Sequence, residues 1–280
     1  MPCATAALLA ALLAPSFALA APVPRPAVDR FDEHAAWARL VAQVELGPRP
    51  AGSPASRKLA AQLKAALPRG SYQPVPGGLR NVVGFVRGRD PSRFVVVAAH
   101  YDTKDLPGFV GANDGASGTA VLVQLARTIK PRTIRASVVF LALDGEEVPD
   151  GKPDSQFLTY GIRGARVAAP IYRKAKAMIL LDFVGDSDLS IPREASSDRS
   201  LWARLRRAAA RVGVDSVFPP RAAGPVLDDH YPFLREGVPS IDLIDFDFPC
   251  WHRPCDDLSA VSMRSLDAVG ETLVELLRSM

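Results

Sequence analysis

The stretch VVFLALDGEEVPD, residues 138–150, passes from a fully apolar run directly into acidic residues. Asp144, Glu146 and Glu147 follow the apolar residues 138–143. Ionised carboxylates beside a hydrophobic core are costly unless a positive charge pairs with them. A bound cation would supply that charge, so we expect further ligands for it elsewhere in the chain.

Other residues of types that can bind a metal also stand at or after the ends of apolar runs. The run FVVVAAHYD ends in His100 and Asp102, AMILLDFVGD contains Asp182, and SIDLIDFDFPCWH leads to His252. The glycine-rich loop VGANDGASG adds Asp114. Imidazole nitrogen and carboxylate oxygen form a ligand set that suits Zn²⁺. The sequence therefore predicts a metal site.

Each candidate ligand also has a structural explanation. A histidine at the end of a strand can be a buried structural residue, Asp114 can cap a turn or helix, and a Glu-Glu pair is common on a solvated face. The coincidence of several such positions at expected strand ends favours the metal site. The glycine-rich loop does not read as a phosphate-binding loop, because no Gly-Lys-Ser/Thr follows it.

Strand and helix patterns alternate along the chain. We expect strands at 79–88, 93–102 (after a turn at RDPS, 89–92), 138–143, 176–186 and 237–245, and helices at 28–46, 55–67, 119–129, 198–213 and 261–280. This alternation predicts an α/β three-layer sandwich with a central, mostly parallel sheet. In such sheets, ligands bind at the carboxyl ends of the strands.

The motif order HYD, GANDGASG, DGEE, LLDFVGD and WH resembles the zinc aminopeptidase and glutaminyl-peptide cyclotransferase superfamily, metallopeptidase family 28. The resemblance covers essentially the whole mature chain and implies a fold of the zinc-dependent exopeptidase type. The positions that match its metal ligands are His100, Asp114, Glu147, Asp182 and His252. Asp114 matches the bridging ligand of members that bind two metal ions.

The resemblance also implies catalytic residues and two alternative reactions. Glu146 matches the general acid/base, and Asp182 and Asp228 match further catalytic positions. The aminopeptidases of the superfamily usually bind two zinc ions and hydrolyse the N-terminal residue from a peptide. The glutaminyl cyclases use one zinc ion and convert an N-terminal glutamine into pyroglutamate with release of ammonia.

Several segments resemble the cyclase branch more closely. HYDTK resembles its HYDSK, YGIRGAR resembles its YGSR helix start, and VLDDHYPFLREGVPSIDLID resembles the segment in which Asp228 matches an aspartate hydrogen-bonded into the active site. Trp251 matches a substrate-binding indole beside the zinc histidine. Two structural alternatives remain open at this point. Trp251 can be a core aromatic residue, and Asp228 and Asp229 can cap the following helix.

Two departures from the animal cyclases concern the substrate. VPDGKPDSQFLTYG lacks the tryptophan that those enzymes place after DGEE, and Asp242 stands where they carry a histidine. Because the segments above resemble the cyclase branch, we expect a glutaminyl-peptide cyclotransferase acting on peptide or protein N-termini despite these departures. An aminopeptidase is the alternative. A non-catalytic binding module on the same fold is a remote alternative, because the ligands and Glu146 are all present.

The N-terminal residues predict export from the cytoplasm. An apolar run over residues 1–20 ends in Ala18-Leu19-Ala20, the pattern of a signal-peptidase site. Cleavage would leave one catalytic domain, residues 21–280, secreted or periplasmic and without stable membrane insertion; a retained anchor is the alternative. The net charge of +4 is spread along the chain, which favours a solvated surface over a nucleic-acid interface.

The cysteines leave one question open. Cys3 would leave with the signal peptide, and Cys250 and Cys255 remain in FPCWHRPCDD. In an oxidising compartment these two form either a disulfide or two free thiols.

Overall fold

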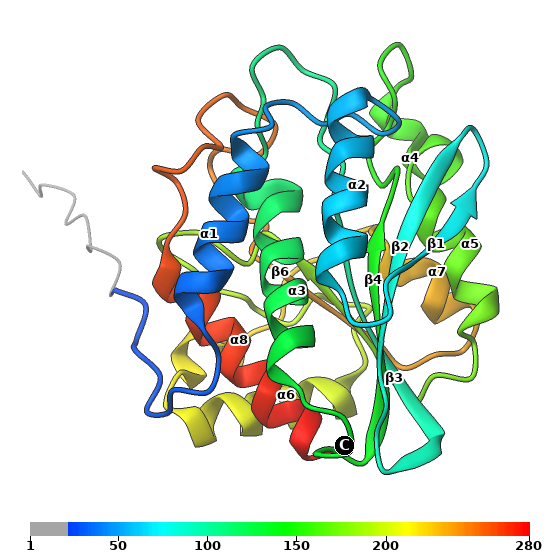
Figure 1. Cartoon of the computed structure of the whole chain (residues 1–280). Helices are drawn as coiled ribbons and strands as arrows, with labels where there is room; N and C mark the ends of the chain where they lie inside the picture. Colours follow the sequence, from blue (N-terminus) through cyan, green and yellow to red (C-terminus); the bar gives the residue numbers. More distant parts are fainter. Residues whose placement is uncertain (1–21) are drawn as a thin grey trace, which may run out of the picture.

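The computed structural model describes residues 22–280 as a β-sheet with helices on both faces (Figure 1). The strands are β1 (Ser71–Val75), β2 (Leu79–Val86), β3 (Asp90–His100), β4 (Ala136–Leu143), β5 (Met178–Asp182) and β6 (Ser240–Ile244). The helices are α1 (Glu33–Val44), α2 (Pro54–Ala66), α3 (Gly118–Thr128), α4 (Phe157–Tyr160), α5 (Arg163–Ile171), α6 (Arg199–Val212), α7 (His230–Arg235) and α8 (Met263–Arg278). Three short helical turns are η1 (Ala112–Ser117), η2 (Asp154–Gln156) and η3 (Asp215–Val217).

The sheet has the order β1-β2-β4-β3-β5-β6 and is mostly parallel. β3 pairs in parallel with β4 and β5, and β5 pairs in parallel with β6. β2 runs antiparallel to both β4 and β1. The predicted α/β class with a mostly parallel central sheet is thus confirmed. β1 was not expected, because its sequence SYQPV contains a proline and is largely exposed at the edge of the sheet.

Residues of β3 alternate between two hydrophobic cores. Val95, Val97 and Ala99 pack in the core that contains residues of α1, α2, α3, α6 and α8. Val96 and Ala98 pack in the core that contains residues of α5 and α7. Because successive strand residues point to opposite faces, a strand covered on both faces needs an apolar residue at every position. This explains the continuous apolar run before His100.

The turn expected at RDPS is wrong, because β3 already begins at Asp90. The pairing with β4 shifts register between Asp90 and Phe94, so these residues form an irregularity within the strand. The Ser92 N–H donates to Asp90 Oδ1 at 3.1 Å. A local turn-like hydrogen bond therefore lies within the irregular part of the strand, where the pairing with β4 is interrupted.

The glycine-rich loop allows close packing of the backbone near the end of β3. A Cβ atom at Gly118 would lie 2.2 Å from the carbonyl oxygen of Leu181 on β5. Gly115 has φ +91°, and a Cβ atom there would lie 2.8 Å from the carbonyl oxygen of Asp102. Glycine therefore lets α3 begin directly against the sheet, with Asp114 just ahead of it.

The predicted signal peptide, residues 1–20, and Cys3 lie outside the described residues. The cleavage and the division into a leader and one catalytic domain, residues 21–280, stay predictions. Within residues 22–280, every helix is too short or too polar to cross a bilayer.

Buried contacts of Glu194 with His230 and Ser196 support the segment between β5 and α6. Glu194 in this segment and His230 at the start of α7 are both 0% exposed. His230 Nε2 lies 3.5 Å from Glu194 Oε2 and 2.9 Å from Ser196 Oγ, and Ser196 donates its N–H and its Oγ–H to Glu194. Burial opposes ionisation of Glu194, but hydrogen bonds from His230 and Ser196 lower its pKa to about 2.

We expect Glu194→Gln to lower the free energy of unfolding by about 2 kcal/mol at pH 7, allowing for solvent screening near the exposed Ser196. The folded-state pKa lies below the ordinary value of 4.5, so this stabilisation is present above that pH. It is lost as the pH falls towards 2. Urea titrations at several pH values measure the effect, with the exposed Glu236→Gln as control. Equal stability of variant and wild type at pH 7 would contradict the assignment.

Candidate metal centre and pocket

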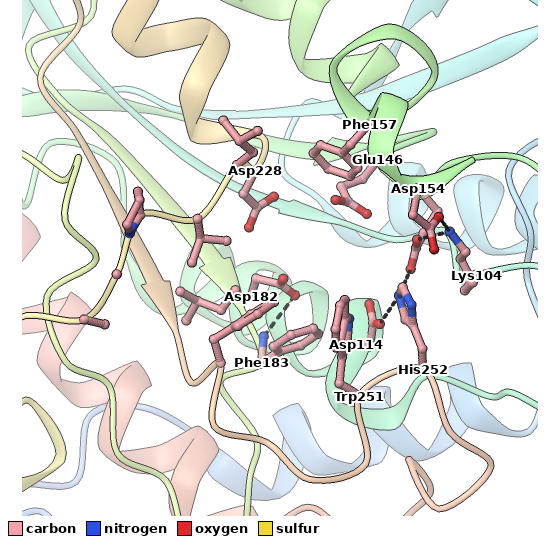
Figure 2. Close-up of a pocket in the computed structure, with 18 of the residues that line it drawn as sticks. Lys104, Asp114, Glu146, Asp154, Phe157, Asp182, Phe183, Asp228, Trp251 and His252 are labelled. Carbon is pink, nitrogen blue, oxygen red and sulfur yellow. Dashed lines mark hydrogen bonds and ion pairs between the residues drawn. The ribbon is translucent and has the colours of Figure 1, made fainter. Parts of the chain in front are cut away.

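The predicted ligands lie together at the carboxyl ends of the parallel strands. His100 is the last residue of β3 and Asp182 the last of β5, while Glu147 follows β4 within a few residues. Asp114 lies in η1, immediately before α3, with non-helical φ and ψ angles. His252 reaches the same place from the loop between β6 and α8 (Figure 2). The parallel arrangement of the strands brings these side chains to one edge of the sheet.

The side chains form two groups that share Asp114. In the first group, His100 Nε2 lies 3.2 Å from Asp114 Oδ1 and 3.2 Å from Asp182 Oδ1. In the second, His252 Nε2 lies 3.0 Å from Glu147 Oε1 and 3.5 Å from Asp114 Oδ2. The two oxygens of Asp114 thus face different triads, which is the geometry of a bridging carboxylate.

Asp102 orients both the first triad and the acidic loop. His100 Nδ1 lies 3.1 Å from the carbonyl oxygen of Asp102, so Nδ1 can donate there and leave Nε2 free as a ligand atom. The carboxylate of Asp102 accepts hydrogen bonds from the backbone N–H groups of Gly145, Glu146 and Glu147 at 2.9, 3.2 and 3.2 Å. Asp102 therefore fixes the direction of two acidic side chains and lies outside both triads.

Two further supports were not apparent from the sequence. The carboxylate of Asp256 accepts from the N–H groups of Asn113 and Asp114 at 2.7 and 3.0 Å. The guanidinium of Arg49, fully buried, donates to the carbonyl oxygens of Val110 and Gly111 at 2.8 and 3.2 Å. The only sequence signal for Arg49 and Asp256 is that each lies near a segment that interrupts the helix and strand patterns, at GPRP and after WH. This signal is too general to identify a role.

The pKa values show an excess of negative charge at the site. Burial, followed by the charge of Glu147, raises the pKa of Asp114 to about 8. Burial and the charge of Asp182 raise the pKa of Asp228 to about 7. Burial alone would lower the pKa of His100, but Asp182 and Asp114 raise it well above its ordinary value. The carboxylates have too little positive charge around them, which a bound divalent cation would correct.

The orphaned oxygen of Asp114 supports the same conclusion. Asp114 Oδ2 is buried and has no hydrogen-bond partner among residues 22–280, although it faces His252. A buried oxygen of this kind needs a partner, and a metal ion is one. Two histidine nitrogens with three carboxylates, one of them shared, fit Zn²⁺ at either triad. The assignment of the individual ligands stays a prediction.

Glu146 lies beside the triads and faces the pocket. Its side chain is nearly buried, and its Oε2 lies 4.0 Å from His100 Nδ1, on the side of the ring away from the first triad. Burial and the charge of Glu147 raise its pKa well above the ordinary value. A carboxyl group next to a metal site, with a raised pKa and no metal to bind, is suited to moving protons.

The pocket in front of the triads has a volume of about 520 Å³. Glu146 and Asp228 extend into it from the side opposite Trp251 (Figure 2). Trp251 is 45% exposed, so the alternative that it is a core residue is wrong. Its ring centroid lies 4.7 Å from that of His252 and 5.0 Å from that of Phe246.

Phe157 of α4 also lines the pocket. It comes from the VPDGKPDSQFLTYG segment, in which the tryptophan of the animal cyclases is absent. An aromatic side chain therefore lines the pocket beside Glu146, as Trp251 does on the opposite side (Figure 2). The sequence did not identify it, because Phe157 lies ten residues beyond Glu147 and only the turn of the chain through η2 and α4 brings it back.

The two aspartates before α7 have different surroundings, one lining the pocket and the other in the interior. Asp228 lines the pocket and accepts the N–H of Asp229, while Asp229 is buried and makes no capping hydrogen bond among residues 22–280. Asp229 thus occupies the N-cap position of α7 without a capping hydrogen bond from its side chain to residues 22–280. Asp242 lies on β6 and is fully buried, with its Oδ2 3.6 Å from His230 Nδ1.

Cys250 and Cys255 are joined by a disulfide, with their Cα atoms 5.4 Å apart. The bond encloses Trp251 and His252 within one short loop. Of the two alternatives that the sequence left open, the structure contains the disulfide.

Comparisons with known proteins agree with this geometry. Glutaminyl-peptide cyclotransferase of Drosophila melanogaster is 29% identical over 70% of this chain and 64% of its own length. Aminopeptidase YwaD of Bacillus subtilis is 26% identical over 69% of this chain and 42% of its own length. The chain therefore spans less than two thirds of the length of these curated relatives.

Solved structures match over more of both chains. Glutaminyl cyclase of Tannerella forsythia has a TM-score of 0.78 at 27% identity, covering 89% of this chain and 99% of its own. A Zn-dependent exopeptidase of Parabacteroides distasonis has a TM-score of 0.77 at 25% identity, covering 91% and 100%. The model of peptidase family M28 matches residues 81–277, which include the predicted ligands and Glu146. As the motif order predicted, the chain belongs to peptidase family M28 and has the fold of its enzymes.

Proposed function

We propose that this protein is a zinc-dependent glutaminyl-peptide cyclotransferase that acts on the free N-termini of peptides and proteins. The observation that carries the proposal is the position of Glu146, a buried carboxyl group of raised pKa that faces a pocket with four aromatic lining residues, beside the Asp114–Glu147–His252 triad. The similarity to glutaminyl cyclases of known structure supports it.

The reaction joins two groups of one glutamine residue. The α-amine nitrogen bonds to the γ-carbonyl carbon, the bond from that carbon to the side-chain nitrogen breaks, and ammonia leaves. Zinc held by Asp114, Glu147 and His252 would polarise the γ-carbonyl group. Glu146 accepts a proton from the attacking amine and returns it to the departing nitrogen.

The remaining residues of the pocket orient the substrate. Asp228 and Asp182 line the same pocket as Glu146, and their carboxylates are suited to hold the α-amino group by hydrogen bonds. The indole of Trp251, exposed to the pocket and packed against His252, provides a flat apolar surface for the glutamine side chain.

One observation keeps the aminopeptidase alternative in place. The His100–Asp114–Asp182 triad is as compact as the second triad and shares Asp114 with it, so the chain has the ligands for a second zinc ion. The similarity to Aminopeptidase YwaD points the same way. With two ions, Glu146 would activate a water molecule for hydrolysis of the N-terminal peptide bond. The ion count, one or two, thus separates the two reactions.

We further propose that the protein works in the periplasm or outside the cell. The apolar N-terminal run supports this location, and the Cys250–Cys255 disulfide is typical of an oxidising compartment.

The first test compares two substrates on the zinc-loaded protein. With a peptide that begins with glutamine, we expect ammonia and a pyroglutamyl peptide of unchanged length. With a leucine anilide, we expect little or no release of the aniline. Ammonia is measured by a coupled enzyme assay, and the peptide by its mass loss. Release of leucine without formation of ammonia would reject the cyclase in favour of the aminopeptidase.

The variant Glu146→Gln tests the assigned acid/base. We expect kcat to fall by about 10²–10⁴-fold, because the amide cannot carry the proton. Zinc content, measured by metal analysis, should remain that of the wild type, since Glu146 lies outside both triads. Glu236→Gln, on the surface, serves as a control of equal chemistry. Turnover at the wild-type rate would show that another group moves the proton.

The variant Asp102→Asn tests the support of the acidic loop. An asparagine keeps one acceptor oxygen but turns an NH₂ group towards backbone N–H donors, so the loop that holds Glu147 should shift. We expect the zinc affinity, measured by competition with a chelator, to fall by about 10–100-fold. An unchanged affinity would mean that the hydrogen bonds from residues 145–147 do not orient the ligand.

A further inference from the structure

The backbone at His252 is held differently from the backbone at the other predicted ligands. His100 and Asp182 end strands that are buried on both faces, and Asp102 holds the backbone at Glu147. His252 lies in the long loop between β6 and α8. Its backbone has φ +52°, a left-handed conformation that is unfavourable for a residue with a Cβ atom. Something in this loop must hold it in the conformation that the triad needs.

The non-covalent contacts of this loop are an edge-to-face contact of Phe109 with His252, the packing of Phe246 on Trp251, and hydrogen bonds that span three residues. Trp251, Arg253 and Cys255 are exposed, so much of the segment is in contact with solvent. Within the segment, the Arg253 N–H donates to the carbonyl oxygen of Cys250 at 3.0 Å. The downstream end is fixed by Asp256, whose carboxylate accepts from the backbone beside Asp114. The upstream end, at Cys250, is joined to this fixed end by the disulfide to Cys255.

We propose that the Cys250–Cys255 disulfide positions His252 as a metal ligand and Trp251 as the pocket wall. The inference rests on the proposed zinc site. A covalent link across six residues removes most of the alternative conformations of the loop before the metal binds. Without the link, the left-handed conformation at His252 must be selected during binding, and the affinity falls by the cost of that ordering.

The effect of the disulfide on zinc binding is confined to one triad. His252 belongs to the Asp114–Glu147–His252 group, whereas the His100–Asp114–Asp182 group contains no residue of this loop. Reduction of the disulfide should therefore weaken zinc binding only where His252 takes part. Because Cys255 is exposed, a reductant reaches the bond in the folded protein.

The experiment measures zinc affinity by chelator competition for the oxidised wild type, the wild type reduced with a phosphine, and the variant C250S/C255S. We expect the reduced wild type and the variant to bind zinc about tenfold more weakly than the oxidised protein. Reoxidation should restore the affinity of the wild type. Reduction of the folded wild type makes the result independent of how well the variant folds.

Two controls separate positioning from a general effect. The affinity of C250S/C255S should not respond to the phosphine, which excludes metal binding by the reductant. The zinc affinity of His252→Ala should not change on reduction either. The visible spectrum of bound cobalt should change on reduction in the wild type but not in the two variants. A response in His252→Ala equal to that of the wild type would overturn the proposal, because the disulfide would then act on the whole fold.

The proposal and the function can fail separately. Equal zinc affinities of the oxidised and reduced wild type would overturn the role of the disulfide and leave the zinc enzyme intact. Absence of zinc binding by the oxidised protein would overturn both.

Discussion

The structure depends on the placement of several carboxylates in one buried site with too little positive charge around them. Asp114, Glu146 and Asp228 all have raised pKa values because they are buried close to other acids. No gain in stability follows from such an arrangement by itself, since each buried charge loses its hydration. A divalent cation turns the same arrangement into a favourable one. The excess negative charge is therefore the physical reason for expecting a metal ion here, independent of any family likeness.

The carboxylates can be held together without the ion because the backbone around them is fixed from outside the triads. Asp102 and Asp256 each accept backbone N–H groups of the loops that carry Glu147 and Asp114. Arg49 holds the carbonyl groups just before η1. In all three cases a buried charge is satisfied by peptide groups, so the charge makes the loop rigid. The precision of the candidate site thus depends on residues that touch neither metal nor substrate.

The parts of the fold that the sequence predicted follow from local patterns. Apolar runs ending in His100, Asp182 and the DGEE segment identified both the strands and the edge where ligands meet, because parallel strands place their carboxyl ends side by side. The sequence did not identify β1, Arg49, Asp256 or Phe157, whose roles depend on contacts between distant segments. Asp256, for example, lies 143 residues from Asn113, whose N–H it accepts. The pairing of Cys250 with Cys255 was left open, because spacing alone does not determine redox state.

The ligand set cannot by itself distinguish cyclisation from hydrolysis, since both triads are complete and share Asp114. The difference between the reactions is the nucleophile, which is an amine of the substrate in one and water in the other. Phe183 stacks on Phe246 at 6.1 Å between ring centroids, and Phe246 packs on Trp251 at 5.0 Å, so the wall beside His252 is continuous and aromatic. This wall offers apolar surface on one side of a pocket whose lining also contains seven carboxylates. The choice between the two nucleophiles therefore depends on how a substrate fills the space between this wall and Glu146, which the ligands alone do not determine.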